Sequence, residues 1–378
     1  MSAADQGVAP VICIVGARPN YMKMAPILKA FARHEPPIPT LLVHTGQHYD
    51  AAMNDRLFSD LDLPHPDINL EVGSASHAVQ TAEVMKRFEP VIESHGARAV
   101  LVVGDVNSTL ACALVAVKRH IPVVHVEAGL RSGDLSMPEE INRLVTDSIS
   151  DWFFVTEPSG RDNLLREGKP ASAVHYVGHV MVDNLFYQAD KLDNFETGHF
   201  ETAGFKAAHP RYGVVTLHRP SNVDDADTFA RIGGALRTVS EQLPLIFPVH
   251  PRTRGNLDRF GIDLGPRVTL VGPRAYMEFL NLWKDASVAL TDSGGLQEET
   301  TALGVPCVTI RENTERPVTV DEGTNVLVGT DADRIVEAAG RAIQGQSKQG
   351  RRPALWDGRA AERIVEILAR ELCRAATC

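Results

Sequence analysis

Short apolar runs alternate with longer amphipathic stretches along most of this chain, and this alternation limits the folds open to it. In the first half, apolar runs at 11–15, 40–44, 99–103 and 123–126 are interleaved with helix-like stretches at 21–32 and 109–118. A second series follows, with a helix at 226–242 among apolar runs at 212–217, 245–248, 268–271, 288–290 and 307–310. Strands separated by helices build parallel sheets that are covered on both faces. We therefore predict an α/β protein with two doubly wound domains, with the crossover near residue 180.

Composition narrows the possible partners. The chain has 378 residues, of which 44% are hydrophobic and 23% charged, as expected for a soluble two-domain protein. Its net charge of −10 and lack of a basic block argue against nucleic acid as a partner. Five scattered cysteines without a CxxC pair indicate a reducing cytoplasm, with no disulfide framework or structural zinc. No signal peptide or apolar run long enough to span a bilayer is apparent, so we expect no membrane partner.

The stretch 288–317 has the pattern of a strand, a glycine turn and a helix. An apolar run ends at Leu290, the turn is Thr291 to Gly295, and the predicted helix 296–303 carries acids in its first turn, with Gly304 after its end. Backbone amides and the positive end of the helix dipole meet at such a turn, which makes Ser293, Gly294 and Gly295 a candidate phosphate seat. Glu298 and Glu299 are candidate acceptors for ribose hydroxyls, or else ordinary partners of the helix dipole. Arg311 and Arg316, after the next strand, add cationic donors.

Ligands of doubly wound sheets bind beyond the carboxyl ends of the strands, so the residues that follow each strand matter. After the first strand, Arg18 and Lys23 are candidates for holding a pyrophosphate, or else surface charges beside a turn. Asp105 is placed to reach a ligand, although an Asp before a helix is commonly an N-cap. Glu127 follows its strand directly and should be half-buried, which is costly without a partner or a task. The absence of a GxGxxG motif argues against a nicotinamide or flavin cofactor.

Further acids and histidines complete two chemical sets. Pro138 opens a helix with Glu139 and Glu140 in its first turn, and this pattern by itself is common at helix N-termini. His218 with Arg219, and His250 with Arg252, form two His–Arg pairs at the ends of adjacent strands. Asp105, Glu127 and Glu139 therefore form a first set, of acids suited to proton transfer. His218, Arg316 and the turn at Ser293 to Gly295 form a second set, suited to a diphosphate. No spacing resembles a metal site, so we expect no metal.

These residues carry a resemblance to a known family. The motifs GARPNYMKMAPI, TGQHYD, GDVNSTLA, HVEAGLRSGD, MPEEINR, TLHRPSN, FPVHPR and TDSGGLQEE with RENTERP occur in this order over about residues 11–330. Together they resemble the non-hydrolysing UDP-N-acetylglucosamine 2-epimerases. The resemblance implies two Rossmann-like domains of the GT-B kind at 8–180 and 181–358, a C-terminal helix at 359–375 that packs on the first domain, an active site in the interdomain cleft, and a homodimer.

The resemblance also implies a reaction and the residues for it. Members invert C2 of UDP-GlcNAc to give UDP-ManNAc without a cofactor, by eliminating UDP to 2-acetamidoglucal and adding it back. Such chemistry needs a carboxylate base, stabilisation of the leaving diphosphate and exclusion of water. By resemblance, the catalytic residues are Asp105, Glu127, Glu139 and His218, with the base unassigned. The contacts to UDP are Arg18, Lys23, Ser293, Gly294, Gly295, Arg316, Glu299 for the ribose, and Tyr276 or Phe279 on the uracil side.

The sequence departs from many members at a second site, where they bind UDP-GlcNAc as an activator. The stretch NLEVGSASHAVQT lacks one arginine of that site and TLHRPSN another. These departures predict that substrate does not activate this protein, although Gln47, His48, Glu140 and His250 are candidates for part of such a site.

Several alternative functions follow from the same residues. The MPEEINR motif also resembles members that act on UDP-2,3-diacetamido-glucuronate. A hydrolysing relative would differ in letting water reach the glucal and release free ManNAc. A GT-B glycosyltransferase shares the nucleotide half but has no use for three carboxylates, and a non-catalytic nucleotide-sugar sensor would tolerate Glu127→Gln.

Overall fold

The computed structural model describes residues 9–46 and 65–377, and divides the chain into two compact units. Unit 1 comprises Met1–Phe186 and Ala354–Cys378, and unit 2 comprises Tyr187–Pro353. The division falls inside helix α7 (Val180–Asp193), whose first residue is the crossover predicted from sequence. In the described part of the chain, no helix has both the length and the apolar character required to cross a membrane.

Unit 1 is built on a seven-stranded parallel sheet of order β3-β2-β1-β4-β5-β6-β7. The chain reverses direction across the sheet between β1 and β4, as in dinucleotide-binding folds. Its strands are β1 (Val11–Val15), β2 (Thr40–His44), β3 (Ile68–Asn69), β4 (Ala99–Val103), β5 (Val123–Val126), β6 (Trp152–Val155) and β7 (Val174–Tyr176). The central strands β1 and β4 are buried at every position, because helices cover both faces of the sheet.

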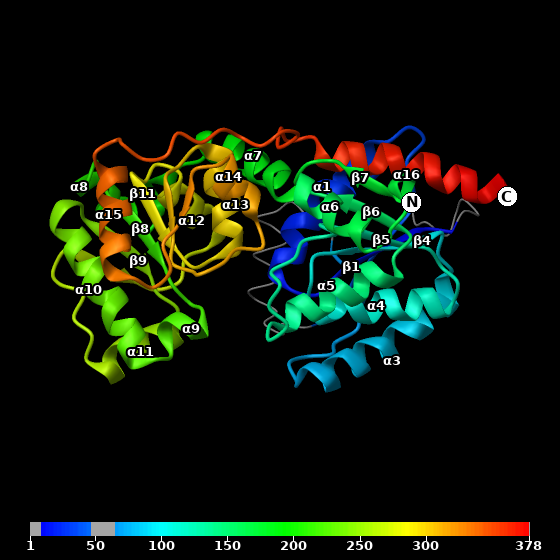
Figure 1. The fold of residues 1–378 in the computed structure, drawn as a ribbon. Coiled ribbons are helices and arrows are strands. Elements are labelled where there is room, and N and C mark those ends of the chain that lie inside the picture. Colours follow the sequence, from blue (N-terminus) through cyan, green and yellow to red (C-terminus); the bar gives the residue numbers. More distant parts are fainter. Residues whose placement is uncertain (1–8, 47–64, 378) are drawn as a thin grey trace. The chain divides into compact units, whose positions relative to one another are not determined.

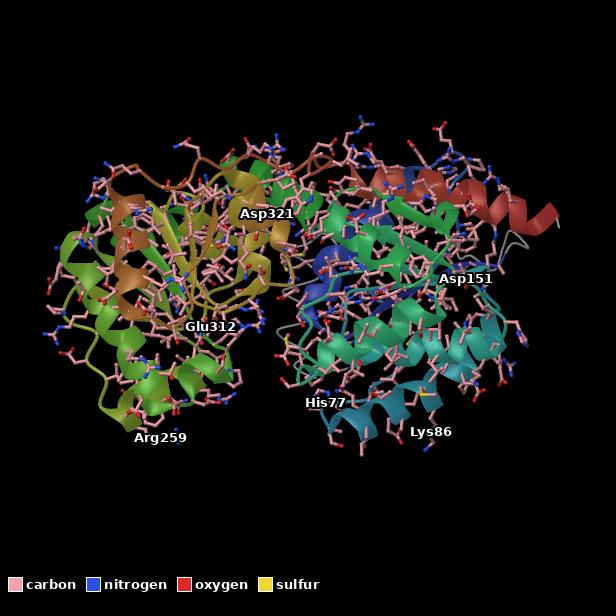
Figure 2. All side chains as sticks on the ribbon, in the orientation of Figure 1. His77, Lys86, Asp151, Arg259, Glu312 and Asp321 are labelled. Atoms are coloured by element: carbon pink, nitrogen blue, oxygen red, sulfur yellow. The ribbon has the colours of Figure 1, made fainter. Side chains whose placement is uncertain are left out.

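Two groups of helices cover the sheet of unit 1, and Figure 1 shows them on opposite faces. On one face lie α3 (His77–His95), α4 (Asn107–Lys118) and α5 (Pro138–Ile149), which pack in sequence. On the other face, α1 (Arg18–Arg33) packs against the C-terminal helix α16 (Ala360–Thr377). The short helices α6 (Pro158–Arg166) and η2 (Ala171–Ala173) complete the unit. Asp151, labelled in Figure 2, accepts a hydrogen bond from the amide of Val123 at 2.8 Å and so joins the starts of β5 and β6.

Unit 2 repeats the plan with a six-stranded parallel sheet of order β10-β9-β8-β11-β12-β13. The strands are β8 (Gly213–Thr216), β9 (Leu245–Pro248), β10 (Val268–Val271), β11 (Val288–Thr291), β12 (Cys307–Thr309) and β13 (Asn325–Leu327). The helices α10 (Ala226–Gln242) and α15 (Ala332–Ile343) pack together on one face, and α12 (Tyr276–Trp283), α13 (Gly294–Leu303) and α14 (Pro317–Asp321) lie on the other (Figure 1). The remaining helices are α8 (Ala203–Ala208), α9 (Pro220–Val223), α11 (Pro251–Phe260) and η3 (Thr197–His199).

The predicted pair of doubly wound sheets is therefore confirmed, with differences at several ends. The helices predicted at 21–32 and 109–118 begin earlier, at Arg18 and Asn107. The strand predicted at 212–217 is shorter at both ends. Between α7 and β8 the chain forms the short helices η3 and α8.

Candidate active site

The three predicted catalytic carboxylates are carried by neighbouring elements of unit 1. Asp105 and Glu127 follow the carboxyl ends of β4 and β5, which are adjacent strands. Glu139 lies in the first turn of α5, with Pro138 as the first residue of that helix. The side-chain amide of Asn142, also on α5, donates to the backbone oxygen of Asp105 at 2.9 Å. This contact ties the helix that carries Glu139 to the loop that carries Asp105.

Glu127 is more deeply buried than the sequence suggests. Only 2% of its surface is exposed, although a half-buried carboxylate was expected. Its backbone φ of 69° lies in the left-handed region, which few residues other than glycine adopt. The partner that burial demands is Lys23, whose buried Nζ forms an ion pair with Glu127. Lys23 thus neutralises a catalytic candidate within unit 1, and its contact with a phosphate stays a prediction.

Asp105 forms an ion pair with Arg143, a residue of α5 that sequence reasoning did not single out. The N-cap of α4 is Val106 and not Asp105, so the interpretation of Asp105 as a helix cap is wrong. Arg143 also donates through Nη2 to Glu140 at 2.7 Å. The sequence did contain a signal for Arg143. This arginine lies four residues after Glu139 and three after Glu140 on one helix, a spacing at which side chains meet.

Glu140, a candidate for an activator site, already has hydrogen-bond partners within unit 1. Its carboxylate accepts hydrogen bonds from the amides of Ser132 at 3.1 and 3.0 Å and of Gly133 at 3.0 Å. Burial alone would raise the pKa of Glu140, but these amides and Arg143 outweigh burial and lower it. Glu140 therefore fixes the loop between β5 and α5. The other candidates of that site in unit 1, Gln47 and His48, lie outside the described residues.

The turn after β1 is held by Asn20, which sequence reasoning also passed over. Asn20 accepts from the amide of Ala17 at 2.9 Å and donates to the carbonyl of Val103 at 2.9 Å. A Cβ on Gly16 would lie 2.4 Å from Ser108 Oγ, so only glycine allows the loop after β1 to approach the start of α4 this closely. Arg18 is the first residue of α1.

In unit 2, the predicted glycine turn is confirmed, but its helix begins earlier than expected. Helix α13 starts at Gly294 with Ser293 as its N-cap and ends at Gly304 in the left-handed conformation. Glu298 and Glu299 therefore lie in the second turn of the helix, and the expectation of first-turn acids was wrong. The amide of Ser293 donates to Thr291 Oγ1 at 2.9 Å. The amides of Gly294 and Gly295 belong to the first turn, where a helix offers no carbonyl partner, so they remain suited to an anion.

A cluster of paired charges lies beside this turn. Arg316 forms ion pairs with Glu298 and Glu315, and Arg311 donates to Glu315 at 2.8 Å. Burial opposes the ionisation of Glu315, but the guanidiniums of Arg316 and Arg311 outweigh it and hold the pKa of Glu315 well below its usual range. Arg316 is thus buried and fixed by two carboxylates, and Glu298 is bound to it.

The neighbouring segment also carries Glu312, which is labelled in Figure 2. Its Oε1 accepts from the amide of Thr330 at 3.2 Å, so Glu312 links the ends of β12 and β13.

The candidates for the ribose and the base lie on two helices of the same face. Tyr276, at the start of α12, donates from its hydroxyl to Glu299 Oε1 at 3.0 Å, and both residues are buried. Phe279, one turn later, is half-buried. The hydrogen bond fixes one oxygen of Glu299, which makes this carboxylate a rigid acceptor.

His218 is an exposed side chain on a buried support. The side chain of His218 is 53% exposed, whereas that of Asp292, whose Oδ1 lies 3.0 Å from His218 Nδ1, is fully buried. The amides of His218 and Arg219 also donate to Asp292, at 3.1 and 2.9 Å. Asp292 was missed by sequence reasoning, although an acid directly after an apolar run and before two glycines was a usable signal. The pKa of Arg219 is lowered, mainly because the guanidinium is buried and secondly because the positive charge of Arg311 is nearby.

The second His–Arg pair does not repeat the first. His250 is the N-cap of α11, and its Nδ1 accepts from the amide of Arg252 at 3.3 Å. The guanidinium of Arg252 forms an ion pair with Asp224. The two His–Arg pairs are therefore held differently, because the second histidine caps a helix while the first is held by a buried acid.

Two Rossmann-like sheets with acid/base side chains beyond their strand ends define the class, a two-domain α/β enzyme. A family model described as UDP-N-acetylglucosamine 2-epimerase matches residues 30–369. The chain belongs to the UDP-N-acetylglucosamine 2-epimerase family, and it is an epimerase, a kind of isomerase.

Two relatives and one solved structure show how similar the chain is to known proteins. A UDP-N-acetylglucosamine 2-epimerase of Methanocaldococcus jannaschii is 39% identical over 94% of this chain and 97% of its own. A UDP-2,3-diacetamido-2,3-dideoxy-D-glucuronate 2-epimerase of Pseudomonas aeruginosa is also 39% identical, over 95% of this chain and 99% of its own. The crystal structure of the Methanocaldococcus jannaschii UDP-GlcNAc 2-epimerase with UDP-GlcNAc and UDP has a TM-score of 0.86 and 38% identity, and the match covers 96% of this chain and 99% of that one.

Proposed function

We propose that this protein is a non-hydrolysing 2-epimerase that interconverts UDP-GlcNAc and UDP-ManNAc. The observation that carries the proposal is a set of three carboxylates in a chain that belongs to this family: Asp105 and Glu127 follow adjacent strands, and Glu139 lies in the first turn of α5. A transferase has no use for three acids beside the sugar. An epimerase at a carbon that carries only a weakly acidic proton requires them.

The proposed reaction proceeds in two opposite steps. A carboxylate of unit 1 removes the proton from C2, the electron pair forms the C1–C2 double bond, and the bond from C1 to the diphosphate oxygen breaks, which gives UDP and 2-acetamidoglucal. UDP then adds back to C1 while a carboxylic acid delivers a proton to the other face of C2. Two acids on opposite faces serve this inversion better than one, because each face needs its own proton donor or acceptor.

The residues of unit 2 are proposed to hold UDP. The first-turn amides of Gly294 and Gly295 with Ser293 would bind a phosphate, and Arg316, fixed by Glu298 and Glu315, would stabilise the charge on the departing diphosphate. His218, exposed and oriented by Asp292, would donate to the same group. Glu299 would accept from the ribose hydroxyls, and Tyr276 or Phe279 would lie beside the uracil. Arg18 and Lys23 of unit 1 are proposed as further phosphate contacts.

Proton NMR with UDP-GlcNAc in D2O, without added metal or cofactor, tests the proposal. We expect UDP-ManNAc that carries deuterium at C2, because in D2O the carboxylic acid that protonates the other face of C2 carries deuterium from the solvent. UDP with free ManNAc would instead establish a hydrolysing enzyme. No conversion and no exchange with either candidate substrate would refute epimerase activity.

Variants of the carboxylates assign the roles. We expect Asp105→Asn, Glu127→Gln and Glu139→Gln each to lower kcat by about 10²- to 10⁴-fold, the usual contribution of a general acid or base. Glu93→Gln is the matched control, because Glu93 is an exposed acid of α3 in the same unit and should leave kcat unchanged. A carboxylate whose amide variant keeps full kcat takes no part in the proton transfers.

A second candidate substrate is UDP-2,3-diacetamido-glucuronate. The chain is 39% identical to a named epimerase of each kind, so overall identity does not separate the two substrates. The MPEEINR motif favours the second candidate by its resemblance. Comparing kcat/KM for the two substrates under one set of conditions decides between them.

A homodimer and a cytoplasmic location complete the proposal. The homodimer rests on the resemblance to the family, and light scattering of the purified protein should give twice the chain mass of 41.2 kDa. The cytoplasmic location rests on the scattered cysteines, of which Cys13, Cys112 and Cys307 are buried and unpaired thiols.

A further inference from the structure

We infer that His125 and Asp147 are positioning residues that hold the three acid/base carboxylates in one arrangement. The inference rests on the proposed function, because that function gives Asp105, Glu127 and Glu139 their roles. Neither His125 nor Asp147 has a place in the proposed reaction, and both are fully buried. Their contacts reach each of the three segments that carry those carboxylates.

His125 links the first two segments. It lies on β5, two residues before Glu127, and its Nδ1 is 2.6 Å from Asp147 Oδ1. Its Nε2 is 2.9 Å from the carbonyl oxygen of Gly104, the residue before Asp105. The ring therefore connects the loop of Asp105 with helix α5, and it does so from the strand that leads to Glu127.

Asp147 links the third segment to the second. It lies on α5, the helix that carries Glu139 in its first turn, and its Oδ2 accepts from the amide of Gly129 at 3.0 Å and from Arg131 Nη2 at 2.7 Å. Burial works against the charge of Asp147, but His125 and Arg131 outweigh it and lower the pKa of Asp147. The carboxylate thus stays charged inside the protein and holds the backbone two residues after Glu127.

The backbone at Glu127 needs this support. A left-handed φ is unfavourable in a residue other than glycine and persists only where the surroundings enforce it. The amides of Glu127 and Ala128 both donate to the carbonyl of Phe154, at 2.9 and 3.2 Å, on one side. Asp147 holds Gly129 on the other side, so the strained residue is fixed between two anchors. Loss of one anchor would let the carboxylate move by a fraction of an ångström.

The test compares His125→Gln and Asp147→Asn with a matched structural control. We expect each variant to lower kcat about 100-fold, the cost of a small misplacement of a reacting group, and to leave the Kd for UDP within about threefold. The double variant should be no worse than about the poorer single one, because the two residues act as a unit. Val84→Ala, a buried truncation on α3, should lower Tm while kcat stays within about threefold.

Hydrogen exchange at the amides of residues 127–129 provides a readout that does not depend on activity. Both variants should accelerate it at least about tenfold, and Val84→Ala should not. If wild type epimerises and the variants keep both kcat and slow exchange, the inference is overturned while the proposed function stands. If wild type does not act on either substrate, the proposed function fails, and the exchange rates alone decide whether the pair holds this loop. Where either variant fails to fold, Arg131→Gln loosens Asp147 from its outer side, and the inference requires a fall in kcat of about tenfold.

Discussion

At the scale of single residues, the candidate site is a set of charges that are paired before any substrate arrives. Glu127 with Lys23, Asp105 with Arg143, and Arg316 with Glu298 are ion pairs with at least one buried member. Such pairs contribute little net stability, since desolvation offsets their attraction, but removal of one partner leaves a costly charge behind. Their value lies in holding each functional group in one orientation.

The pair of Glu127 and Lys23 provides the first prediction. Lys23→Met removes the cation that the structure places at the buried Glu127 carboxylate. We expect the free energy of unfolding to fall by about 3 kcal/mol, measured by urea denaturation. Lys86→Met, at a lysine of α3 whose side chain is 77% exposed, should change it by less than about 0.5 kcal/mol. Equal effects of the two substitutions would contradict the structural importance of the Lys23 pair.

The two adjacent glycines of the anion turn provide a second prediction, because they differ in their surroundings. A Cβ on Gly294 would lie 2.9 Å from Arg316 Nη1 and 3.1 Å from Glu315 Oε1, whereas a Cβ on Gly295 would meet nothing within 4 Å. Gly294→Ala should therefore lower the free energy of unfolding by about 1 kcal/mol. Gly295→Ala should keep or slightly raise stability, since it removes freedom from the unfolded chain.

Gly295→Ala should weaken the binding of UDP even though it does not lower the stability of the protein. The open space at Gly295 is where a phosphate on the first-turn amides would lie, so a methyl group there should weaken the Kd for UDP about tenfold. Isothermal titration measures it. An unchanged Kd would remove Gly295 from the phosphate seat.

At the scale of elements, loops that follow parallel strands are fixed by side chains from the next helices. Asn142 and Arg143 of α5 hold Asp105, and Asn107 of α4 donates to Gln80 of α3 at 2.8 Å. His77, which opens α3 and is labelled in Figure 2, lies 3.1 Å from the same Asn107 amide. The N-terminal parts of three helices therefore form one polar network around Asn107 and the loop of Asp105.

The start of the last helix, α16, is held by the carboxyl group of Asp183, whose ionisation changes with pH. Asp183 on α7 accepts from the amides of Ala360 and Ala361, at 3.1 and 2.7 Å, and so caps α16. Burial raises the pKa of Asp183 to about 6, in spite of these two hydrogen bonds. A carboxyl group whose folded pKa is raised contributes stability that is fully present below the unfolded value of about 4 and is lost as pH rises through about 6.

This linkage gives a third prediction. The contribution of Asp183 should fall by about 3 kcal/mol between pH 4 and pH 7, at 1.36 kcal/mol for each pH unit of difference between the two pKa values. Asp183→Asn cannot ionise, so its unfolding free energy relative to wild type should rise over this range. Urea denaturation at pH 4.5, 5.5 and 6.5 measures the difference, with Asp162→Asn on α6 as the control. A difference that is constant with pH would contradict the raised pKa.

At the scale of the whole molecule, the chain leaves unit 1, builds unit 2 and returns to finish unit 1. The return is fixed by Trp356, whose buried Nε1 donates to the carbonyl of Thr156 at 2.9 Å. Gly178 allows the contact, because a Cβ there would lie 2.0 Å from the carbonyl oxygen of Leu355. Each unit thus has a closed core of its own, although one of them is discontinuous in sequence.

Regulation by substrate is the fourth prediction, and it concerns the protein as a whole. We expect the initial rate to rise hyperbolically with UDP-GlcNAc, and UDP-ManNAc alone to react without a lag. The prediction rests on two arginines of an activator site that, by the family resemblance, this sequence is expected to lack. In the structure, Glu140 and His250 are engaged in fixing a loop and capping a helix. Sigmoidal rates that become hyperbolic when traces of UDP-GlcNAc are added would contradict this prediction.

The order of elements was predictable from the sequence because each element leaves a periodic pattern in its own residues. The strands 11–15, 40–44, 99–103 and 123–126 and the helix 226–242 agree with the structure at both ends. The helix starts at 18, 107 and 294 were missed, because they lie in polar or glycine turns whose conformation is set by contacts such as Asn20 with Val103.

Sequence by itself determined the class of fold, the family and the types of residue in the two chemical sets, since apolar periodicity and ordered motifs are properties of neighbouring residues. Tertiary structure alone decided which charges meet. Lys23 faces Glu127, Arg143 faces Asp105, Asp292 holds His218, and Asp147 with His125 joins three loops. The physical reason is that a buried charge takes its partner from whatever element packs beside it, and that choice depends on strand order and helix packing far along the chain.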